Sequence, residues 1–367
     1  SIFKTKTTVE KRKMNSCAPP YFTIITPVYN AAPFLENTVQ CILRQSFSDF
    51  ELILIDDQSQ DNSWDLCQKF SALDSRVKCF RTPQNGGASA ARNVRLSHVN
   101  GQFLIFIDAD DEVPQDYLKK LHGYSEDYDC DCIKFGLKEI YFNGKGKLIR
   151  TCDCYIQSGL YKTKIDIFRQ MVSLELIPAF GYLWNSIYKV SLIKEHHLLL
   201  NSALKINEDF EFNIRYFQYV RSLCCVNYCG YSYAKRVDGN SLSTAHNERY
   251  YELHMMKINQ FLAIYDSLHM TDQQTLSSIL WMYTRFIYST IQRAMEDKQN
   301  LNSLLFEIKR SDLYMRFMKV ALVGLPRKAR MMIHILRNLP TPILLAAVVC
   351  ISTVKQKYPG FFSMIKR

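Results

Sequence analysis

A group of aspartates that follows an apolar segment has the carboxylate side chains that a metal-dependent reaction needs. Asp108-Ala109-Asp110-Asp111 directly follows Phe103–Ile107, a run typical of a strand buried on both faces. In an extended chain Asp108 and Asp110 point to the same side, so one divalent cation could meet both carboxylates. Oxygen ligands favour Mg²⁺ or Mn²⁺ over zinc. A strand that ends in an acidic turn has the same pattern, so the motif alone leaves both interpretations open.

The segments around this motif predict a parallel sheet whose strands alternate with helices. Strands are expected at Phe22–Thr26, Glu51–Ile55, Val77–Phe80 and Phe103–Ile107, with helices at Pro33–Leu43, Ser63–Leu73 and Ala88–Leu96. Polar clusters follow the first three strands, at Pro27–Asn30, Asp56–Ser59 and Asn85–Gly87. Because the carboxyl ends of parallel strands meet at one edge of a sheet, we expect these clusters to lie together and bind a ligand.

The chemistry of the clusters suits a nucleotide-sugar diphosphate. Tyr29 could stack on the base, and Asp57 could accept a hydrogen bond from the imide N–H of uracil. The pair Gly86-Gly87 allows the backbone to approach a ligand closely, and Arg92 offers a fixed cation. Taken singly, these residues are better explained as a core aromatic, a turn residue, a hinge and a solvated helix charge. Their order along one sheet edge favours the ligand site.

Together the motifs resemble those of glycosyltransferase family two. T-P-V-Y-N, D-D-Q-S-Q-D, N-G-G-A-S-A-A-R-N and D-A-D-D look like the successive signatures of that family, and the resemblance covers roughly residues 21–240. It implies the GT-A fold, which is α/β with a Rossmann-like, mostly parallel sheet. It also implies an inverting hexosyltransferase that uses a nucleotide-sugar, usually a UDP-sugar, with Mn²⁺ or Mg²⁺. Gln58 departs from the family pattern, which commonly has glycine at that place.

The resemblance also implies roles for individual residues. The nucleotide-sugar-binding candidates are Pro27, Tyr29, Asp57, Arg92, Asp108 and Arg236, and Asp110 matches the principal metal ligand. Arg236 lies in the segment Tyr231–Ser241, which resembles the family's Y-x-x-R stretch, with Lys235 as the reserve candidate for the diphosphate. An exposed basic turn would have the same composition.

The pair Glu208-Asp209 is predicted to open a helix. Asn207 as N-cap, with acids in the first turn, would explain the pattern by helix stabilisation alone. The family carries an E-D at this place whose aspartate is the catalytic base. The resemblance therefore makes Asp209 the candidate base and Glu208 a candidate acceptor contact. The base would take the proton of the acceptor hydroxyl as that oxygen attacks the anomeric carbon.

Trp184 and Asn185 are the other candidates for acceptor binding. They begin a W-N-x-x-Y element similar to that of bacterial family members that build surface polysaccharides, such as capsule or lipopolysaccharide. Indole rings support the apolar face of a sugar, and asparagine binds hydroxyl groups. A large aromatic residue is equally expected in any core.

Composition and cysteine content bound the class of protein. The 367 residues, 47% of them hydrophobic, can form one large α/β core and a C-terminal appendage. The pairs Cys130/Cys132 and Cys152/Cys154 flank a predicted hairpin that turns near Asn143–Gly146, so four thiols could meet around zinc. C-x-C is not the usual zinc spacing, and reduced thiols in a cytosolic protein are the simpler interpretation. The basic N-terminal extension lacks an apolar segment and predicts no secretory signal.

Positive charge is concentrated at the C-terminal end. Residues 313–367 contain ten Lys or Arg and no Asp or Glu, in a chain whose net charge is +11. Apolar runs lie between these charges, which predicts an amphipathic surface for anionic lipid rather than for nucleic acid. The uncharged segment Asn338–Val354 is short for a span and contains Pro340 and Pro342, so we expect an interfacial or re-entrant segment. The alternative is packing against a second copy of the chain, as a homo-oligomer.

The expected organisation has four parts. These are an extension (1–20), a GT-A domain (21–245) with a nucleotide half (21–111) and an acceptor half (112–245), a helical linker region (246–310) and a peripheral-membrane tail (311–367). The expected function is sugar transfer to a lipid-linked saccharide at the cytoplasmic face of the inner membrane, for capsule, O-antigen or exopolysaccharide. A silent membrane scaffold is one alternative, but it would be expected to lose Asp110 or Asp209. A sugar-1-phosphate nucleotidyltransferase is the other, but it would need glycine within Pro27–Asn30.

Overall fold

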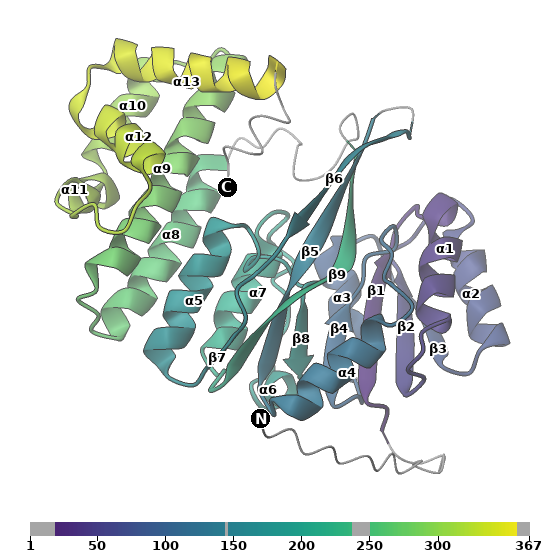
Figure 1. The fold of residues 1–367 in the computed structure, drawn as a ribbon. Helices are drawn as coiled ribbons and strands as arrows, with labels where there is room; N and C mark the ends of the chain where they lie inside the picture. Colours follow the sequence, from purple (N-terminus) through teal and green to yellow (C-terminus); the bar gives the residue numbers. More distant parts are fainter. Residues whose placement is uncertain (1–18, 144–145, 237–249, 358–367) are drawn as a thin grey trace.

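A nine-stranded mixed sheet forms one part of the molecule, and a group of helices packs beside it (Figure 1). The computed structural model describes residues 19–143, 146–236 and 250–357. The strand order is β3-β2-β1-β4-β8-β5-β9-β7, and β6 pairs with β5. The predicted domain boundary at residue 245 lies outside the described residues, because residues 237–249 are not described. Most of the predicted extension, residues 1–20, also lies outside them.

The first half of the sheet agrees with the predicted elements to within two residues. Its elements are β1 (Phe22–Val28), α1 (Ala32–Leu43), β2 (Phe50–Asp56), α2 (Ser63–Leu73), β3 (Val77–Arg81), α3 (Gly87–Leu96) and β4 (Phe103–Phe106). β1, β2 and β4 are buried along almost their whole length, which explains their continuous apolar sequences. All pairings among β1, β2, β3 and β4 are parallel, so their carboxyl ends share one edge.

The second half of the sheet extends that same edge. β8 (Ser186–Lys189) runs antiparallel to both β4 and β5 (Cys132–Phe142), while β9 (Leu223–Arg236) is parallel to β5. β5 and β9 therefore point in the direction of β4. The predicted hairpin is formed by β5 and β6 (Leu148–Cys154), although residues 144–145 of its turn lie outside the described residues. The remaining elements are α4 (Tyr117–Asp127), β7 (Gly159–Tyr161), α5 (Lys164–Leu176), α6 (Val190–Glu195) and α7 (Glu208–Phe217).

The two C-x-C pairs do not meet, so a four-thiol zinc site is wrong. Cys154 pairs with Leu137 across the hairpin, whereas Cys132 lies at the other end of β5. Five residues of strand separate these positions by roughly 16 Å. Every cysteine of the described residues is a free thiol, and Cys130 and Cys132 are buried.

Residues 250–357 contain six helices after the sheet, in agreement with the predicted helical C-terminal region. They are α8 (Tyr250–Ser267), α9 (Gln273–Glu296), α10 (Leu301–Arg310), α11 (Asp312–Met318), α12 (Arg327–Asn338) and α13 (Thr341–Lys357). One face of α9 is apolar and packed inside the molecule, where Ile279, Leu280, Met282, Tyr283 and Ile287 are all buried.

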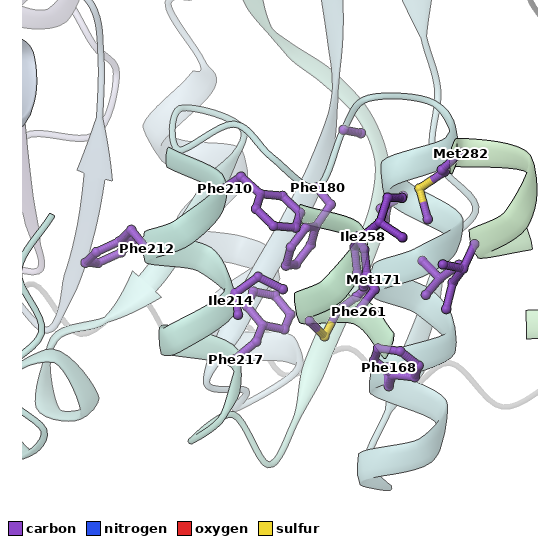
Figure 2. Close-up of a cluster of buried hydrophobic side chains, with 14 of the residues drawn as sticks. Phe168, Met171, Phe180, Phe210, Phe212, Ile214, Phe217, Ile258, Phe261 and Met282 are labelled. Carbon is purple, nitrogen blue, oxygen red and sulfur yellow. The ribbon is translucent and has the colours of Figure 1, made fainter. Parts of the chain in front are cut away.

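These helices share a core with the sheet domain, so the interpretation of α8–α10 as a linker was wrong. Figure 2 shows side chains from α5, α7, α8 and α9 in one cluster. The ring of Phe261 on α8 lies 6.1 Å from Phe168 on α5, 5.3 Å from Phe210 on α7 and 6.0 Å from Phe180. Phe212 leaves α7 on the other side and packs on Phe106 of β4. The helix α7 is therefore held between the sheet and the helical region.

Much of the apolar surface of the C-terminal tail is buried within the molecule. Ile333 and Leu336 of α12 and Leu344 and Val348 of α13 are buried, and both helices pack on α9. The exposed positions of α12 are mainly basic or polar. Nowhere in the described chain does a helix combine the length and apolarity that crossing a bilayer requires.

The shared core predicts that the sheet and the helical region unfold together. Phe261→Ala should lower the free energy of unfolding by about 3–5 kcal/mol, because it leaves a cavity among four elements. The matched control is Phe306→Ala on α10, whose side chain is 61% exposed and which should change stability by less than about 0.5 kcal/mol. Denaturant unfolding followed by circular dichroism measures both. Two separate transitions in the wild type would contradict a shared core.

Candidate active site

The loops after β1 and β2 are tied to one another at the carboxyl edge. The backbone N–H of Asn30 donates to Ser59 Oγ (3.0 Å), and that of Gln60 donates to Asn30 Oδ1 (2.8 Å). Tyr29 is 52% exposed, so it is not a core aromatic, and Pro27 is half-buried at the end of β1. Gln58 has a φ of 61°, a left-handed conformation that glycine adopts without strain. This conformation explains why glycine is common there in the family that the motifs resemble.

Asp57 has a structural role that the sequence did not reveal. Its buried carboxylate accepts hydrogen bonds from Thr82 Oγ1 (2.8 Å) and from the backbone N–H groups of Gly86 (3.1 Å) and Gly87 (2.6 Å). A carboxylate at this position satisfies free N–H groups at the start of α3 and interacts favourably with the helix dipole. Gly87 has a φ of 82°, so the turn needs glycine. Asp57 thereby fixes the turn that places Arg92.

Arg92 joins three segments that are distant in the sequence. Its buried guanidinium donates from Nη2 to Asp108 Oδ1 (2.8 Å) and from Nη1 to Asp209 Oδ1 (3.4 Å). The Asp108 and Asp209 side chains remain 29% and 19% exposed, so part of each carboxylate is open to solvent. The D-A-D-D motif and the candidate base therefore belong to one site.

Burial and mutual repulsion raise the pKa values of these carboxylates. Burial raises the pKa of Asp209 to about 7, because Glu208 and Asp108 add to the increase and Arg92 only partly opposes it. Burial likewise raises the pKa of Asp108, and the neighbouring Asp110 raises it further. Burial lowers the pKa of Arg92, but Asp209 and Asp108 outweigh that effect and the net shift is upward. The guanidinium therefore stays charged, and the acids around it would, when all are ionised, carry more negative charge than it balances.

Tyr231 on β9 anchors the D-A-D-D motif through Asp111. The sequence alone did not predict this contact. The Tyr231 hydroxyl donates to Asp111 Oδ2 (2.7 Å) and accepts from the backbone N–H of Asp108 (3.1 Å). The backbone N–H of Ala234 also donates to Asp111 (3.1 Å). Burial raises the pKa of Asp111 well above its usual range, and Asp108 and Asp110 add to the increase. The alternation of Tyr231 and Tyr233 was the available signal, since it places both rings on one face of a strand.

Trp184 and Asn185 lie behind the site rather than in it. Trp184 is 2% exposed and stacks between Tyr182 and Tyr231, with both ring centroids at 4.5 Å. Asn185 is completely buried, and its Nδ2 donates to the carbonyls of Ala179 (2.7 Å) and Phe135 (3.2 Å). Neither side chain offers surface to an acceptor in this arrangement. The structure therefore favours the core interpretation of Trp184 and corrects the expected acceptor contact of Asn185.

Four further residues singled out in the sequence are Asn207, Glu208, Lys235 and Arg236. Glu208 is half-buried next to Asp209, and burial raises its pKa although Arg92 opposes the shift. Asn207 precedes α7 as expected, but its side chain donates to the carbonyl of Leu253 (3.3 Å) instead of capping the helix. Lys235 forms an ion pair with Glu139. Arg236 ends β9, and its side chain and the loop 237–249 lie outside the described residues.

A comparison with known families identifies this arrangement. Residues 23–196 match the model described as Glycosyl transferase family 2. This region belongs to glycosyltransferase family 2. The match contains the first three loops and the D-A-D-D motif, which confirms the resemblance seen in the motifs. Asp209 lies after the matched region, and its contact with Arg92 brings it into the same site.

Curated relatives of this chain are named as bacterial glycosyltransferases. Bacillus subtilis glycosyltransferase EpsJ is 27% identical over 199 residues, which are 54% of this chain and 56% of EpsJ. Staphylococcus aureus TarS, named a poly(ribitol-phosphate) beta-N-acetylglucosaminyltransferase, is 24% identical over 63% of this chain and 39% of its own length. The chain thus covers between about a third and somewhat over half of the first curated relatives.

A solved structure confirms the GT-A fold and the helical region that follows it. The crystal structure of residues 1–349 of S. aureus TarS in complex with UDP superposes with a TM-score of 0.60 at 18% identity. The superposition covers 90% of this chain and 91% of that structure. The likeness therefore includes both the sheet and most of the helices after it.

The raised pKa of Asp209 predicts how Asp209→Asn affects stability as pH changes. An acid whose pKa is higher in the folded than in the unfolded protein stabilises the fold most at low pH, and this contribution disappears as pH rises through about 7. The free energy of unfolding of the wild type should thus fall by about 1–3 kcal/mol relative to Asp209→Asn between pH 5 and pH 8. Urea unfolding with a chelator present measures the difference. A difference that does not vary with pH would contradict the raised pKa.

Proposed function

We propose that this chain transfers a hexose with inversion from a UDP-sugar to a lipid-linked saccharide, in the synthesis of capsule, O-antigen or exopolysaccharide. The observation that carries the proposal is Arg92, which joins Asp108 of the D-A-D-D motif to Asp209 of α7. Sugar transfer needs a site for the departing diphosphate next to a base for the incoming hydroxyl. The guanidinium brings candidates for both into one site.

Support for a UDP-sugar donor comes from the loops and from the relatives. Tyr29 exposes its ring at the edge of the sheet, where a base could stack, and Asp57 lies in the adjoining loop. TarS was solved with UDP, and its name states that it transfers N-acetylglucosamine to poly(ribitol-phosphate). A polymer acceptor is consistent with the name of TarS.

The acidic residues fit a divalent cation. Asp108, Asp110 and Asp111 follow β4 within five residues, and their mutual repulsion helps to raise the pKa values of Asp108 and Asp111. A divalent cation would relieve that repulsion, and an all-oxygen donor set is the one that Mg²⁺ and Mn²⁺ prefer. We assign Asp110 as the principal ligand, with Asp108 beside it. When bound, the cation would neutralise the negative charge that develops on the departing UDP.

The side chains of this chain then have separate tasks. Asp209 accepts the proton of the acceptor hydroxyl while the oxygen forms the new bond to the anomeric carbon and the bond to the UDP oxygen breaks. Its pKa of about 7 suits a group that must take up a proton at neutral pH. Arg92 orients Asp209 and keeps it close to Asp108. One displacement with one base needs no enzyme nucleophile, and it inverts the configuration at the anomeric carbon.

Two substitutions separate donor binding from transfer. Asp110→Ala should abolish the metal-dependent part of UDP binding, because it removes the principal ligand. Asp209→Asn should keep UDP affinity within about twofold and lower kcat by about 10²–10⁴-fold, the usual contribution of a general base. Calorimetric titration of UDP with and without Mn²⁺ measures binding, and UDP release with lipid-linked acceptors measures transfer.

Asp166→Asn on the exposed first turn of α5 is the matched control for both changes, and it should leave binding and turnover as in the wild type. Binding of UDP without any turnover would indicate the silent scaffold. Absence of both UDP binding and UDP release in the wild type would overturn the proposal.

Attachment to the cytoplasmic face of the inner membrane is the second part of the proposal. Arg327 and Arg330 are exposed on α12 next to the exposed Met331, and Ile343 and Val349 are exposed on α13. Figure 1 shows α13 across the ends of α9 and α10, on the side toward which β5 and β9 extend. Basic side chains beside apolar ones favour an anionic lipid surface. Such contact would bring a lipid-linked acceptor near the carboxyl edge of the sheet.

Vesicle sedimentation tests this attachment. Arg327→Glu with Arg330→Glu should weaken binding to phosphatidylglycerol vesicles by roughly tenfold or more, since each basic residue near the surface contributes about 1 kcal/mol. The control is Lys119→Glu with Lys120→Glu on the exposed face of α4, which makes the same charge change elsewhere. Equal losses in the two double variants, or equal binding of the wild type to phosphatidylcholine alone, would argue against this surface.

A further inference from the structure

A lysine is completely buried in the middle of the sheet. Lys134 lies on β5, and none of its side chain is exposed. Burial lowers the pKa of Lys134 to about 8, so the ammonium is mostly charged at neutral pH. Removing an ammonium from water is expensive unless hydrogen bonds replace its hydration shell. A lysine in such a place needs a set of oxygen partners.

The partners of Lys134 come from one connecting segment. Nζ donates to the carbonyls of Phe180 (2.9 Å), Tyr182 (3.0 Å) and Ala179 (3.4 Å), and to Asn185 Oδ1 (3.3 Å). All four oxygens belong to residues 179–185, which connect α5 to β8. A single ammonium therefore replaces the backbone hydrogen bonds that this irregular segment lacks.

The same segment holds the helix that carries Asp209. Asn213 lies one turn after Asp209 on α7, and its Nδ2 donates to the carbonyls of Phe180 (2.7 Å) and Tyr182 (3.1 Å). Two of the carbonyls that bind Lys134 thus also bind α7. In addition, the backbone N–H of Leu183 is close enough to the Asp209 carboxylate to lower its pKa. The segment therefore contacts α7 through Asn213 and through Asp209 itself.

We propose that Lys134 is a positioning residue for Asp209, because its ammonium fixes the segment 179–185 against α7. The inference rests on the proposed function, in which Asp209 is the base. Lys134 touches neither acceptor nor donor, so it acts through the carbonyls of Phe180 and Tyr182 and the N–H of Leu183. An apolar side chain of the same size would leave the carbonyls of Phe180 and Tyr182 with Asn213 as their remaining side-chain donor, and the segment would shift.

The test compares Lys134→Met with Lys138→Met. Methionine keeps the approximate length of lysine and removes its donors, while Lys138 lies on the same strand with a half-exposed side chain that only approaches Asp153 (3.9 Å). We expect Lys134→Met to lower kcat by about 10–100-fold, since a shift of about 1 Å in a catalytic group can cost that much. KM for the donor and the affinity for UDP should stay within about twofold. Lys138→Met should match the wild type.

A double-variant cycle distinguishes positioning from general loss of structure. If Lys134 acts through Asp209, Lys134→Met should cost little further activity in the Asp209→Asn background, because the group it positions is already inactive. An equal fold-loss in both backgrounds, or a loss that appears in KM for the donor, would overturn the inference.

Lys134→Gln, which retains two N–H donors, should recover part of kcat, and it decides the matter if Lys134→Met does not fold. Full activity of either folded variant would also contradict the inference. An inactive wild type would instead refute the proposed function, so the two failures are distinguishable.

Discussion

The active site depends on one buried cation, the guanidinium of Arg92. Acidic side chains brought to one place repel each other, and burial strengthens that repulsion. Arg92 binds Asp108 and Asp209 directly and keeps them together, although its charge does not balance the whole group. When ionised, these acids would favour a bound divalent cation, and their charge adds to the effect of burial, which raises the pKa of Asp209 to about 7. One electrostatic arrangement thus prepares both the metal motif and the candidate base.

Much of the rest of the fold keeps these charges in place. Asp57 caps α3 and thereby sets the position of Arg92. Tyr231, supported by its stacking on Trp184, holds Asp108 and Asp111 from β9. The side of α7 that faces the helical region packs on Phe261, which explains why the C-terminal helices are continuous with the core. The aromatic and polar residues behind the site therefore act by support rather than by contact with a substrate.

Several elements could be predicted from the sequence because their signals are local. The strands and helices of residues 22–106 follow from apolar runs and amphipathic periodicity, and the clusters after the strands follow from the rule that parallel strands end at one edge. The D-A-D-D motif and the family were likewise readable from short segments. The positions of Trp184 and Asn185 could not be predicted in this way, because an indole or amide suited to a sugar is equally suited to a core. Their burial is decided by β9 and the segment 179–185.

The sequence by itself determined the order of elements, the family and the set of ionisable residues available for chemistry. Only the tertiary structure decided that Asp209 meets Arg92, which lies 117 residues earlier in the sequence, and that the helical region is part of the core. It also decided that the two C-x-C pairs lie apart. The physical reason is that periodicity and turn residues act over a few positions. Charge pairing and burial depend on which segments pack together, and no short stretch of sequence specifies that.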